Sequence, residues 1–159
     1  MPAVRFERDG FHSYADVIVA AAPFARRARE DYGVGEADLL AAVRNRVRLV
    51  LCIADDLGRE RLVLGAFGCG AFGGDPAVMA EAFRVELAGG AHGVREVVFA
   101  VPRGRTDENL EVFEHALATF PDPNPAPYVS RAERVAAEAA AAASAADDED
   151  ADDDWRQYL

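Results

Sequence analysis

The sequence predicts an α/β fold in which a mainly parallel sheet lies between layers of helices. Continuous apolar runs, typical of buried strands, alternate along the chain with longer stretches whose apolar residues recur at helical spacing. Pro23 ends one of the apolar runs, and Gly58 ends one of the stretches with helical spacing. This order favours a parallel sheet, because parallel strands need crossover connections between them. With 159 residues, the chain has room for one domain of this kind.

Three apolar runs are interpreted as strands buried on both faces. They comprise residues 16–23, 62–67 and 97–101, and each is too short and too continuous to indicate an amphipathic helix. Residues 4–7 are expected to form a short edge strand before them.

Helices are expected between and after these strands. In residues 36–57 apolar side chains recur every four positions, which places them on one helix face. Asp75 is suited to cap the next helix, and Pro76 to occupy its first turn. A last core helix is expected after Asp107.

The character of the chain changes after Phe120. Four prolines alternate with small or polar residues between positions 121 and 127, which indicates an extended linker. An Ala-rich stretch follows, and the run 147–154 is almost entirely carboxylate and is expected to repel itself into disorder. We therefore predict a domain in residues 1–120 and a Pro-rich linker, Ala-rich stretch and acidic disordered tail in residues 121–159.

The charge of the chain limits its partners. The formal net charge is −11, and every basic residue is Arg. An acidic surface gains nothing from the counterion release that drives binding to long nucleic acids, so such a partner is not expected. No apolar run is long enough to span a bilayer, and the first residues lack the apolar core of a signal peptide. The expected location is cytoplasmic or nuclear, without membrane contact. The aromatic end Trp155–Leu159 is either a docking motif for a protein partner or an ordinary terminus.

A glycine-rich loop is the strongest candidate for a binding site. It follows the predicted strand at 62–67, opens the predicted helix at Pro76, and has glycine at positions 68, 70, 73 and 74. Glycine lets the backbone approach a ligand closely, and N–H groups near a helix N-terminus suit phosphate oxygens. Open α/β sheets also place their ligands at the carboxyl ends of strands. The alternative is a tight strand-to-helix turn without a ligand.

A dinucleotide-binding Rossmann unit is a competing interpretation, because Gly68–Gly73 matches GxGxxG. That fingerprint requires an acidic residue about 20 positions further on, at the end of the next strand. Here the next predicted strand ends at Val101, more than 30 positions after Gly68. The spacing therefore argues against this interpretation.

The longer string from Leu62 to Pro76, followed by a helix and by Val97–Val101, resembles the C-terminal half of the microbial-type poly(ADP-ribose) glycohydrolases. These enzymes are a branch of the macrodomain superfamily, so the resemblance implies a three-layer α/β/α macrodomain-like fold. It covers roughly residues 4–120, and in that family the glycine loop wraps the diphosphate of ADP-ribose. The resemblance implies the same role for Gly70, Ala71, Phe72 and Gly73, with Phe72 as an apolar wall beside the ribose and with Gly68 and Cys69 as the entry of the loop.

Departures from the family pattern weaken the expectation of catalysis. The family has a further half-domain with a triple-glycine loop, a Gln and two adjacent Glu that cleave the glycosidic bond. This sequence contains none of these combinations, and its catalytic residues remain unknown. It is expected to lack the N-terminal strands and the catalytic loop. After Pro23 the family usually has Asn, whereas this chain has Phe24.

Three functions remain open. The favoured one is binding of ADP-ribose, a related nucleotide diphosphate or an ADP-ribosylated protein, without catalysis by this chain alone. The second is a poly(ADP-ribose) glycohydrolase fragment completed by a missing N-terminal half or a partner, and the third is a protein-interaction module that uses the acidic tail. Cys69 is interpreted as a small loop residue, with an activated thiol as the alternative. No cofactor or metal is predicted, since the three histidines are scattered.

Overall fold

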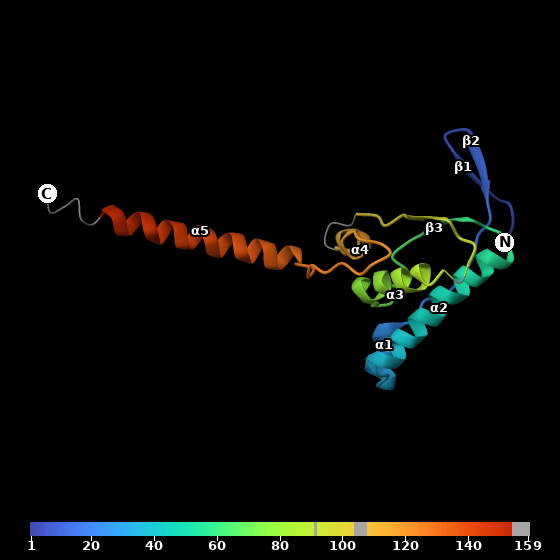
Figure 1. The fold of residues 1–159 in the computed structure, drawn as a ribbon, viewed down its shortest axis with the longest axis horizontal. Coiled ribbons are helices and arrows are strands. Elements are labelled where there is room, and N and C mark those ends of the chain that lie inside the picture. The colour runs from blue at the N-terminus through green and yellow to red at the C-terminus, as the bar shows by residue number, and fades with distance from the viewer. Residues whose placement is uncertain (91, 104–107, 154–159) are drawn as a thin grey trace. The chain divides into compact units, whose positions relative to one another are not determined.

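The computed structural model describes residues 1–90, 92–103 and 108–153, with side chains as far as residue 144. The chain divides into two compact units, residues 1–125 and the residues from 126 onward. The predicted docking segment Trp155–Leu159 lies outside the described residues. Each unit is described by itself (Figure 1).

A parallel strand pair forms the centre of the first unit. Strand β3 (Arg61–Leu64) pairs in parallel with β4 (Glu96–Phe99), with Val63 opposite Val98. These strands confirm the two predicted at 62–67 and 97–101, although both are shorter than expected. Helix α3 (Pro76–Ala88) forms the crossover between them.

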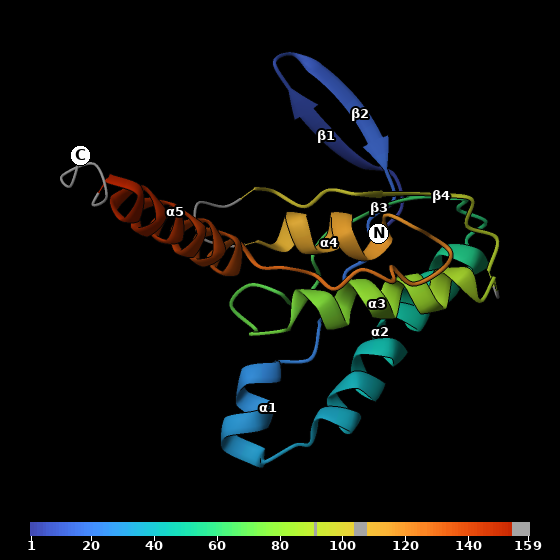
Figure 2. The ribbon, with the colours of Figure 1, turned by 60° about the vertical axis from the view of Figure 1, so that its left-hand side comes forward.

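Three helices cover one face of this pair. They are α2 (Glu36–Asp56), α3 and α4 (Asn109–Leu117), and they lie on the same side of β3 and β4 in both ribbon views (Figure 2). The covered face contributes Leu62, Leu64 and Phe99 to the core. The buried core side chains come from the helices and from Val101, and they include Val43, Val47, Leu51, Met79, Phe83 and Phe113.

The N-terminal residues form a separate hairpin. Strand β1 (Val4–Arg8) pairs antiparallel with β2 (Phe11–Ala15). The two residues between them, Asp9 and Gly10, both have positive φ, as a two-residue hairpin turn requires. The strand expected at 4–7 is therefore present, but it pairs within this hairpin.

The strand predicted at 16–23 is not formed. This segment runs without regular structure from the hairpin to α1 (Ala25–Tyr32), and Val19 is 78 % exposed. Apolar composition alone does not make a strand, because the backbone also needs a pairing partner. In the part of the chain that the structure describes, each sheet has two strands and helices cover β3–β4 on one side, so the expected three-layer arrangement is not seen.

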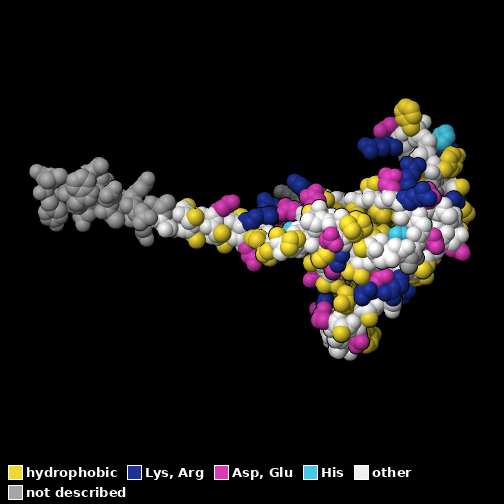
Figure 3. All heavy atoms as spheres, in the orientation of Figure 1, with side chains coloured by type: hydrophobic (Ala, Val, Ile, Leu, Met, Phe, Trp, Pro, Cys, Tyr) yellow, Lys and Arg dark blue, Asp and Glu magenta, His cyan; other side chains and the backbone are white. Residues whose placement is uncertain are grey.

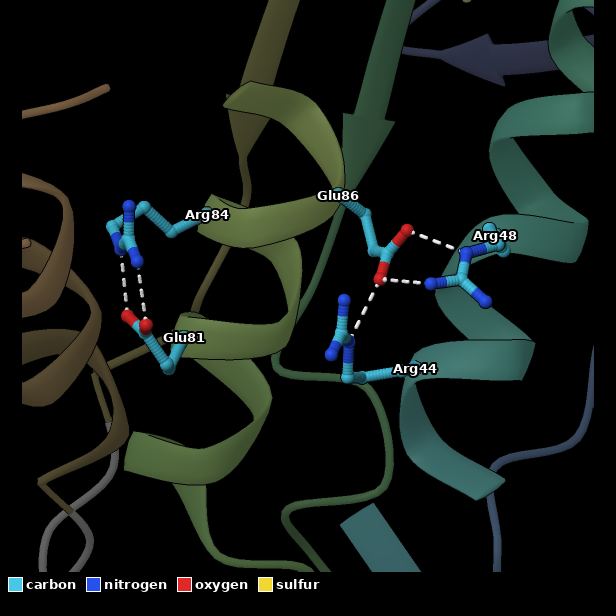
Figure 4. A network of polar contacts seen from close by, with 5 residues as sticks. All are labelled: Arg44, Arg48, Glu81, Arg84 and Glu86. Atoms are coloured by element: carbon cyan, nitrogen blue, oxygen red, sulfur yellow. Dashed lines mark hydrogen bonds and ion pairs between the residues drawn. The ribbon is translucent and has the colours of Figure 1, made fainter. Parts of the chain in front are cut away.

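An ion-pair cluster joins α2 to α3 (Figure 4). The Glu86 carboxylate accepts hydrogen bonds from Arg44 at 2.8 Å and from Arg48 at 2.7 and 3.0 Å. Only 9 % of the Glu86 side chain is exposed. Burial acts to raise the pKa of this carboxyl, but the hydrogen bonds from both arginines outweigh it, so its pKa lies below the usual value of 4.5.

The second unit contains α5 (Arg131–Asp153). Ser130 and Glu133 form a reciprocal capping box, in which each backbone N–H donates to the other side chain, at 2.8 and 3.2 Å. The expectation of disorder for 147–154 differs from the structure, which continues the helix through Asp153. The Ala-rich stretch before it favours such propagation. No helix among the described residues is long and apolar enough to cross a membrane.

Candidate binding site at the glycine loop

The glycine-rich loop connects β3 to α3, as the sequence predicts. Asp75 caps the helix: its carboxylate accepts hydrogen bonds from the N–H groups of Ala77 at 2.8 Å and Val78 at 3.4 Å. The capping prediction is thus confirmed. The carboxylate faces the first turn of α3, where it also complements the helix dipole.

The base of the loop is closed on itself. The N–H of Gly74 donates to the carbonyl of Gly68 at 2.9 Å, and the N–H of Gly73 donates to that of Gly70 at 2.9 Å. A Cβ atom at Gly74 would lie 2.8 Å from the Gly68 oxygen, and one at Gly68 would lie 2.6 Å from Cβ of Ala22. Gly68 also has a φ of +79°, so only glycine fits there without strain.

The tip of the loop is open. Gly70, Ala71 and Phe72 are exposed, and no described residue accepts a hydrogen bond from their three backbone N–H groups. A Cβ atom at Gly70 would meet nothing within 4 Å. Three consecutive unpaired donors close to a helix N-terminus can bind an anion that carries several oxygens.

Helix α1 holds the loop from the other side. The backbone N–H of Arg26 donates to the Phe72 carbonyl at 3.1 Å, and its guanidinium donates to the Ala71 carbonyl at 3.3 Å. Arg29 donates to the Gly73 carbonyl at 3.3 Å and to both carboxylate oxygens of Glu36 at 2.6 and 2.8 Å. The carbonyls of Ala71, Phe72 and Gly73 are thereby occupied, while the N–H groups of Gly70, Ala71 and Phe72 have no acceptor among the described residues. The Arg26 guanidinium also places a positive charge beside the tip, whereas that of Arg29 is neutralised by Glu36.

Phe24 stacks on the loop. Its ring lies 5.0 Å from that of Phe72, with 24° between the planes, and the guanidinium groups of Arg26 and Arg27 lie 5.7 and 6.0 Å from the Phe24 centroid. The sequence marks Phe24 only as a departure from the family pattern, and the structure brings it to the site. Phe24 therefore packs on the exposed Phe72 ring, and two guanidinium groups lie close to Phe24 in turn.

Cys69 is not an activated thiol. Burial and the nearby Asp75 charge raise its pKa to about 11, so the thiol is protonated at neutral pH. Its Sγ lies 3.7 Å from the Phe67 carbonyl, to which it donates. Within the described residues no group of three or more His, Cys, Asp or Glu could hold a metal ion.

Sequence reasoning missed Arg26 and Arg29, which contact the loop from more than 40 positions away. A signal was present in the sequence, because Arg26, Arg27 and Arg29 form a basic group in a chain with an excess of acid. Nothing in the sequence showed that this group would face the loop.

Solved structures provide the comparison with known proteins. The poly(ADP-ribose) glycohydrolase of Deinococcus radiodurans in complex with ADP-ribose matches with a TM-score of 0.65 and 35 % identity, over 71 % of this chain and 49 % of that chain. The same enzyme in apo form matches with a TM-score of 0.68 and 34 % identity, over 77 % and 53 %. The enzyme of Thermomonospora curvata matches with a TM-score of 0.61 and 33 % identity, over 70 % and 44 %.

These matches confirm the resemblance inferred from the sequence. The chain spans about half the length of the enzymes it matches. No model of a known protein family matches this sequence, and no curated protein does.

Proposed function

Because this chain carries a poly(ADP-ribose) glycohydrolase-like domain, we propose that it binds ADP-ribose, or a related nucleotide diphosphate, through its glycine-rich loop. The observation that carries the proposal is the row of three unpaired N–H groups at Gly70, Ala71 and Phe72. In the matched D. radiodurans structure the crystallised ligand is ADP-ribose, whose diphosphate is an anion of the kind that such donors suit.

Each part of the site has a distinct role in this proposal. The N–H groups donate to the diphosphate oxygens, and the guanidinium group of Arg26 lowers the electrostatic free energy of the bound anion, while Arg29, paired with Glu36, anchors the loop. The exposed Phe72 ring offers an apolar surface to a ribose. Residues 1–125 hold 14 Arg and 19 Asp or Glu, a net charge of −5, which opposes an anionic ligand and keeps the expected affinity weak.

Calorimetric titration with ADP-ribose, NADP and ATP tests the ligand class. We expect ADP-ribose to bind best, because the loop resembles that of the glycohydrolases and lacks the acidic residue of a Rossmann site. A clear preference for NADP would instead support the Rossmann interpretation. Absence of binding by all three would leave the loop as a structural turn and would contradict the proposal.

The substitution Gly70→Val tests the location. A Cβ atom there meets nothing within 4 Å in the free protein, whereas a branched side chain blocks the approach of a ligand to the loop tip. We expect ADP-ribose binding to be lost while the thermal midpoint stays within a few degrees. Gly35→Val is the matched control, because a Cβ at Gly35 also meets nothing within 4 Å and lies outside the loop. Normal binding by the Gly70 variant would show that the ligand, if any, binds elsewhere.

We further propose that this chain alone does not hydrolyse poly(ADP-ribose). Cleavage needs a positioned acid, which contributes roughly 10²- to 10⁴-fold. Asp75 is committed to capping, and Glu81 pairs with Arg84 at 2.6 and 2.7 Å, so its pKa is lowered by that hydrogen bond (Figure 4). The measurement is release of ADP-ribose from the polymer. Robust release that is lost in Glu81→Gln or Asp75→Asn would refute this part of the proposal.

A further inference from the structure

Phe24 lies where the chain enters α1, next to the glycine loop. Its carbonyl accepts the hydrogen bond of the Ala28 N–H at 2.9 Å, so the first turn of the helix fixes its backbone. The chain on both sides of it is close to the loop: Ala22 is buried, and a Cβ atom at Gly73 would lie 2.9 Å from Cβ of Arg26. The backbone therefore sets where the Phe24 ring lies relative to the loop.

The Phe24 ring supports the ring of Phe72. Their centroids lie 5.0 Å apart with 24° between the planes, as in stacked aromatic pairs. The Arg26 N–H holds the backbone of Phe72 through its carbonyl at 3.1 Å. Phe72 is 39 % exposed, and side chains as open as this change rotamer readily unless a neighbour restrains them. Stacking on a fixed ring supplies that restraint.

The two rings differ in what remains open to a ligand. The guanidinium groups of Arg26 and Arg27 lie over the Phe24 ring, and each is held by an acceptor, the Ala71 carbonyl at 3.3 Å and the Asp31 carboxylate at 2.8 Å. Phe24 is half-buried, whereas Phe72 is exposed. Phe24 thus supports the site from behind, and Phe72 presents the surface that a ligand can contact.

Phe72 is part of the loop tip that carries the unpaired donors. Its own N–H is one of the three, so an anion bound there brings the next group of the ligand toward the Phe72 ring. An aromatic face suits the C–H groups of a sugar ring. A ring that is already held in place binds them without the entropic cost of ordering a side chain.

We propose that Phe24 is a positioning residue of the binding site. By holding Phe72 in one orientation, it makes the loop tip select a nucleoside diphosphate that carries a sugar at its far end over one that ends at the diphosphate. The inference rests on the proposed function and deepens it. The resemblance to the glycohydrolases assigns no role to Phe24, because the sequence departs from the family pattern at this position.

Calorimetric titration with ADP-ribose and with ADP provides the test. We expect Phe24→Ala to weaken ADP-ribose binding roughly three- to tenfold and to leave ADP binding unchanged, because only the first ligand has a sugar to place against Phe72. Phe24→Tyr keeps the ring and should restore the preference for ADP-ribose. Phe11→Ala is the matched control, because Phe11 is 82 % exposed on the β1–β2 hairpin, which carries hydrophobic side chains away from the loop (Figure 3).

A second measurement needs no ligand. Three-bond couplings to Cγ of Phe72, recorded by NMR in the free protein, report the populations of its χ1 rotamers. We expect one rotamer in the parent chain and in Phe24→Tyr, and an average over several rotamers in Phe24→Ala.

The outcomes separate this inference from the proposed function. If the parent chain binds ADP-ribose and Phe24→Ala leaves the ratio of the two affinities unchanged, the inference is overturned and the proposed function stands. Equal weakening of ADP-ribose and ADP would likewise overturn it, because Phe24 would then support the donors and not the ring. A single Phe72 rotamer in Phe24→Ala would show that other contacts hold the ring, and would also overturn the inference. If the parent chain bound neither ligand, the proposed function would fail, and this inference with it.

Discussion

The base and the tip of the glycine loop use the same residue type for opposite purposes. At the base, Gly68 and Gly74 are glycine because a Cβ atom would lie 2.6 and 2.8 Å from neighbouring atoms. At the tip, Gly70 has open space around it, and its N–H has no acceptor among the described residues. The first group holds the loop in its conformation, and the second leaves room for a ligand.

This difference shows how a loop becomes a site. The base and the α1 arginines fix the backbone through its carbonyl groups, so the donors at the tip are held in place before any ligand arrives. Preorganisation of this kind avoids the entropic cost of ordering the loop on binding. Glycine content alone does not separate these two roles.

The largest difference between base and tip is expected when the same methyl group is added to each by a Gly→Ala substitution. Gly68→Ala combines a φ of +79° with a contact of 2.6 Å to Ala22, so we expect a loss of roughly 2–5 kcal/mol in the free energy of unfolding. Gly70→Ala should change it by less than about 0.5 kcal/mol. Thermal and urea unfolding followed by circular dichroism measure both. Equal effects would mean that the tip is as tightly packed as the base.

Two glutamates of α3, Glu86 and Glu81, also differ in how much each stabilises the fold (Figure 4). Glu86→Gln should lower the free energy of unfolding by roughly 1–3 kcal/mol, because it removes charge from a nearly buried carboxylate that two arginines contact. Glu81→Gln removes the charge of a half-exposed carboxylate that contacts one arginine, and Arg84, although only 12 % exposed, keeps its hydrogen bond to the Pro121 carbonyl, so the expected loss is smaller, about 1 kcal/mol. If urea unfolding gave a larger loss in the free energy of unfolding for Glu81→Gln than for Glu86→Gln, this expectation would be wrong.

The pH dependence gives an independent check on Glu86. Its pKa is lower in the folded than in the unfolded state, so the folded state binds fewer protons and is stabilised above pH 4.5. This stabilisation is lost as the pH falls from 4.5 through the lower, folded-state pKa. The Glu86→Gln variant should therefore lose less stability than the parent chain in this window, as acid titrations of unfolding would show. If the free energy of unfolding fell equally with pH in the variant and in the parent chain, the account of Glu86 would be contradicted.

A smaller effect is expected at the arginine that flanks the tip. Arg26→Ala should weaken ADP-ribose binding about three- to tenfold and reduce its dependence on salt, because one positive charge beside the anion is removed. Arg46→Ala, on the exposed side of α2, is the control and should have no effect on binding. Calorimetry at two ionic strengths separates the outcomes. An unchanged affinity in Arg26→Ala would limit that residue to anchoring the loop.

The smallest effect is expected from removing the second unit. Truncation after Pro125 should shift the thermal midpoint of the remaining chain by less than about two degrees, because residues 1–125 form a compact unit with its own core. A drop of ten degrees in the melting curve would show that the removed residues stabilise the first unit.

The elements that flank the loop were predictable because their local signals agree with their packing. Asp75 and Pro76 indicate the start of α3, and the apolar spacing in 36–57 matches the buried residues of α2. The hairpin was only half predicted, although Asp9-Gly10 is a strong two-residue turn signal that sequence reasoning overlooked.

Other features depend on contacts between distant segments. Residues 16–23 have the composition of a buried strand, but no strand pairs with them among the described residues. The glycine loop was located correctly by sequence, whereas its contacts with α1 were not foreseen. Glycine spacing predicts a flexible turn, but only the fold decides which N–H groups remain free.

The most direct test of the central claim is to observe the loop amides during a ligand titration. In ¹H–¹⁵N correlation spectra, we expect ADP-ribose to shift the amide resonances of Gly70, Ala71 and Phe72 most strongly, since these N–H groups have no acceptor in the free protein. The amides of Gly73 and Gly74, which already donate within the loop, should move less. Saturable shifts confined to residues outside the loop, with the three tip amides unchanged, would contradict the account.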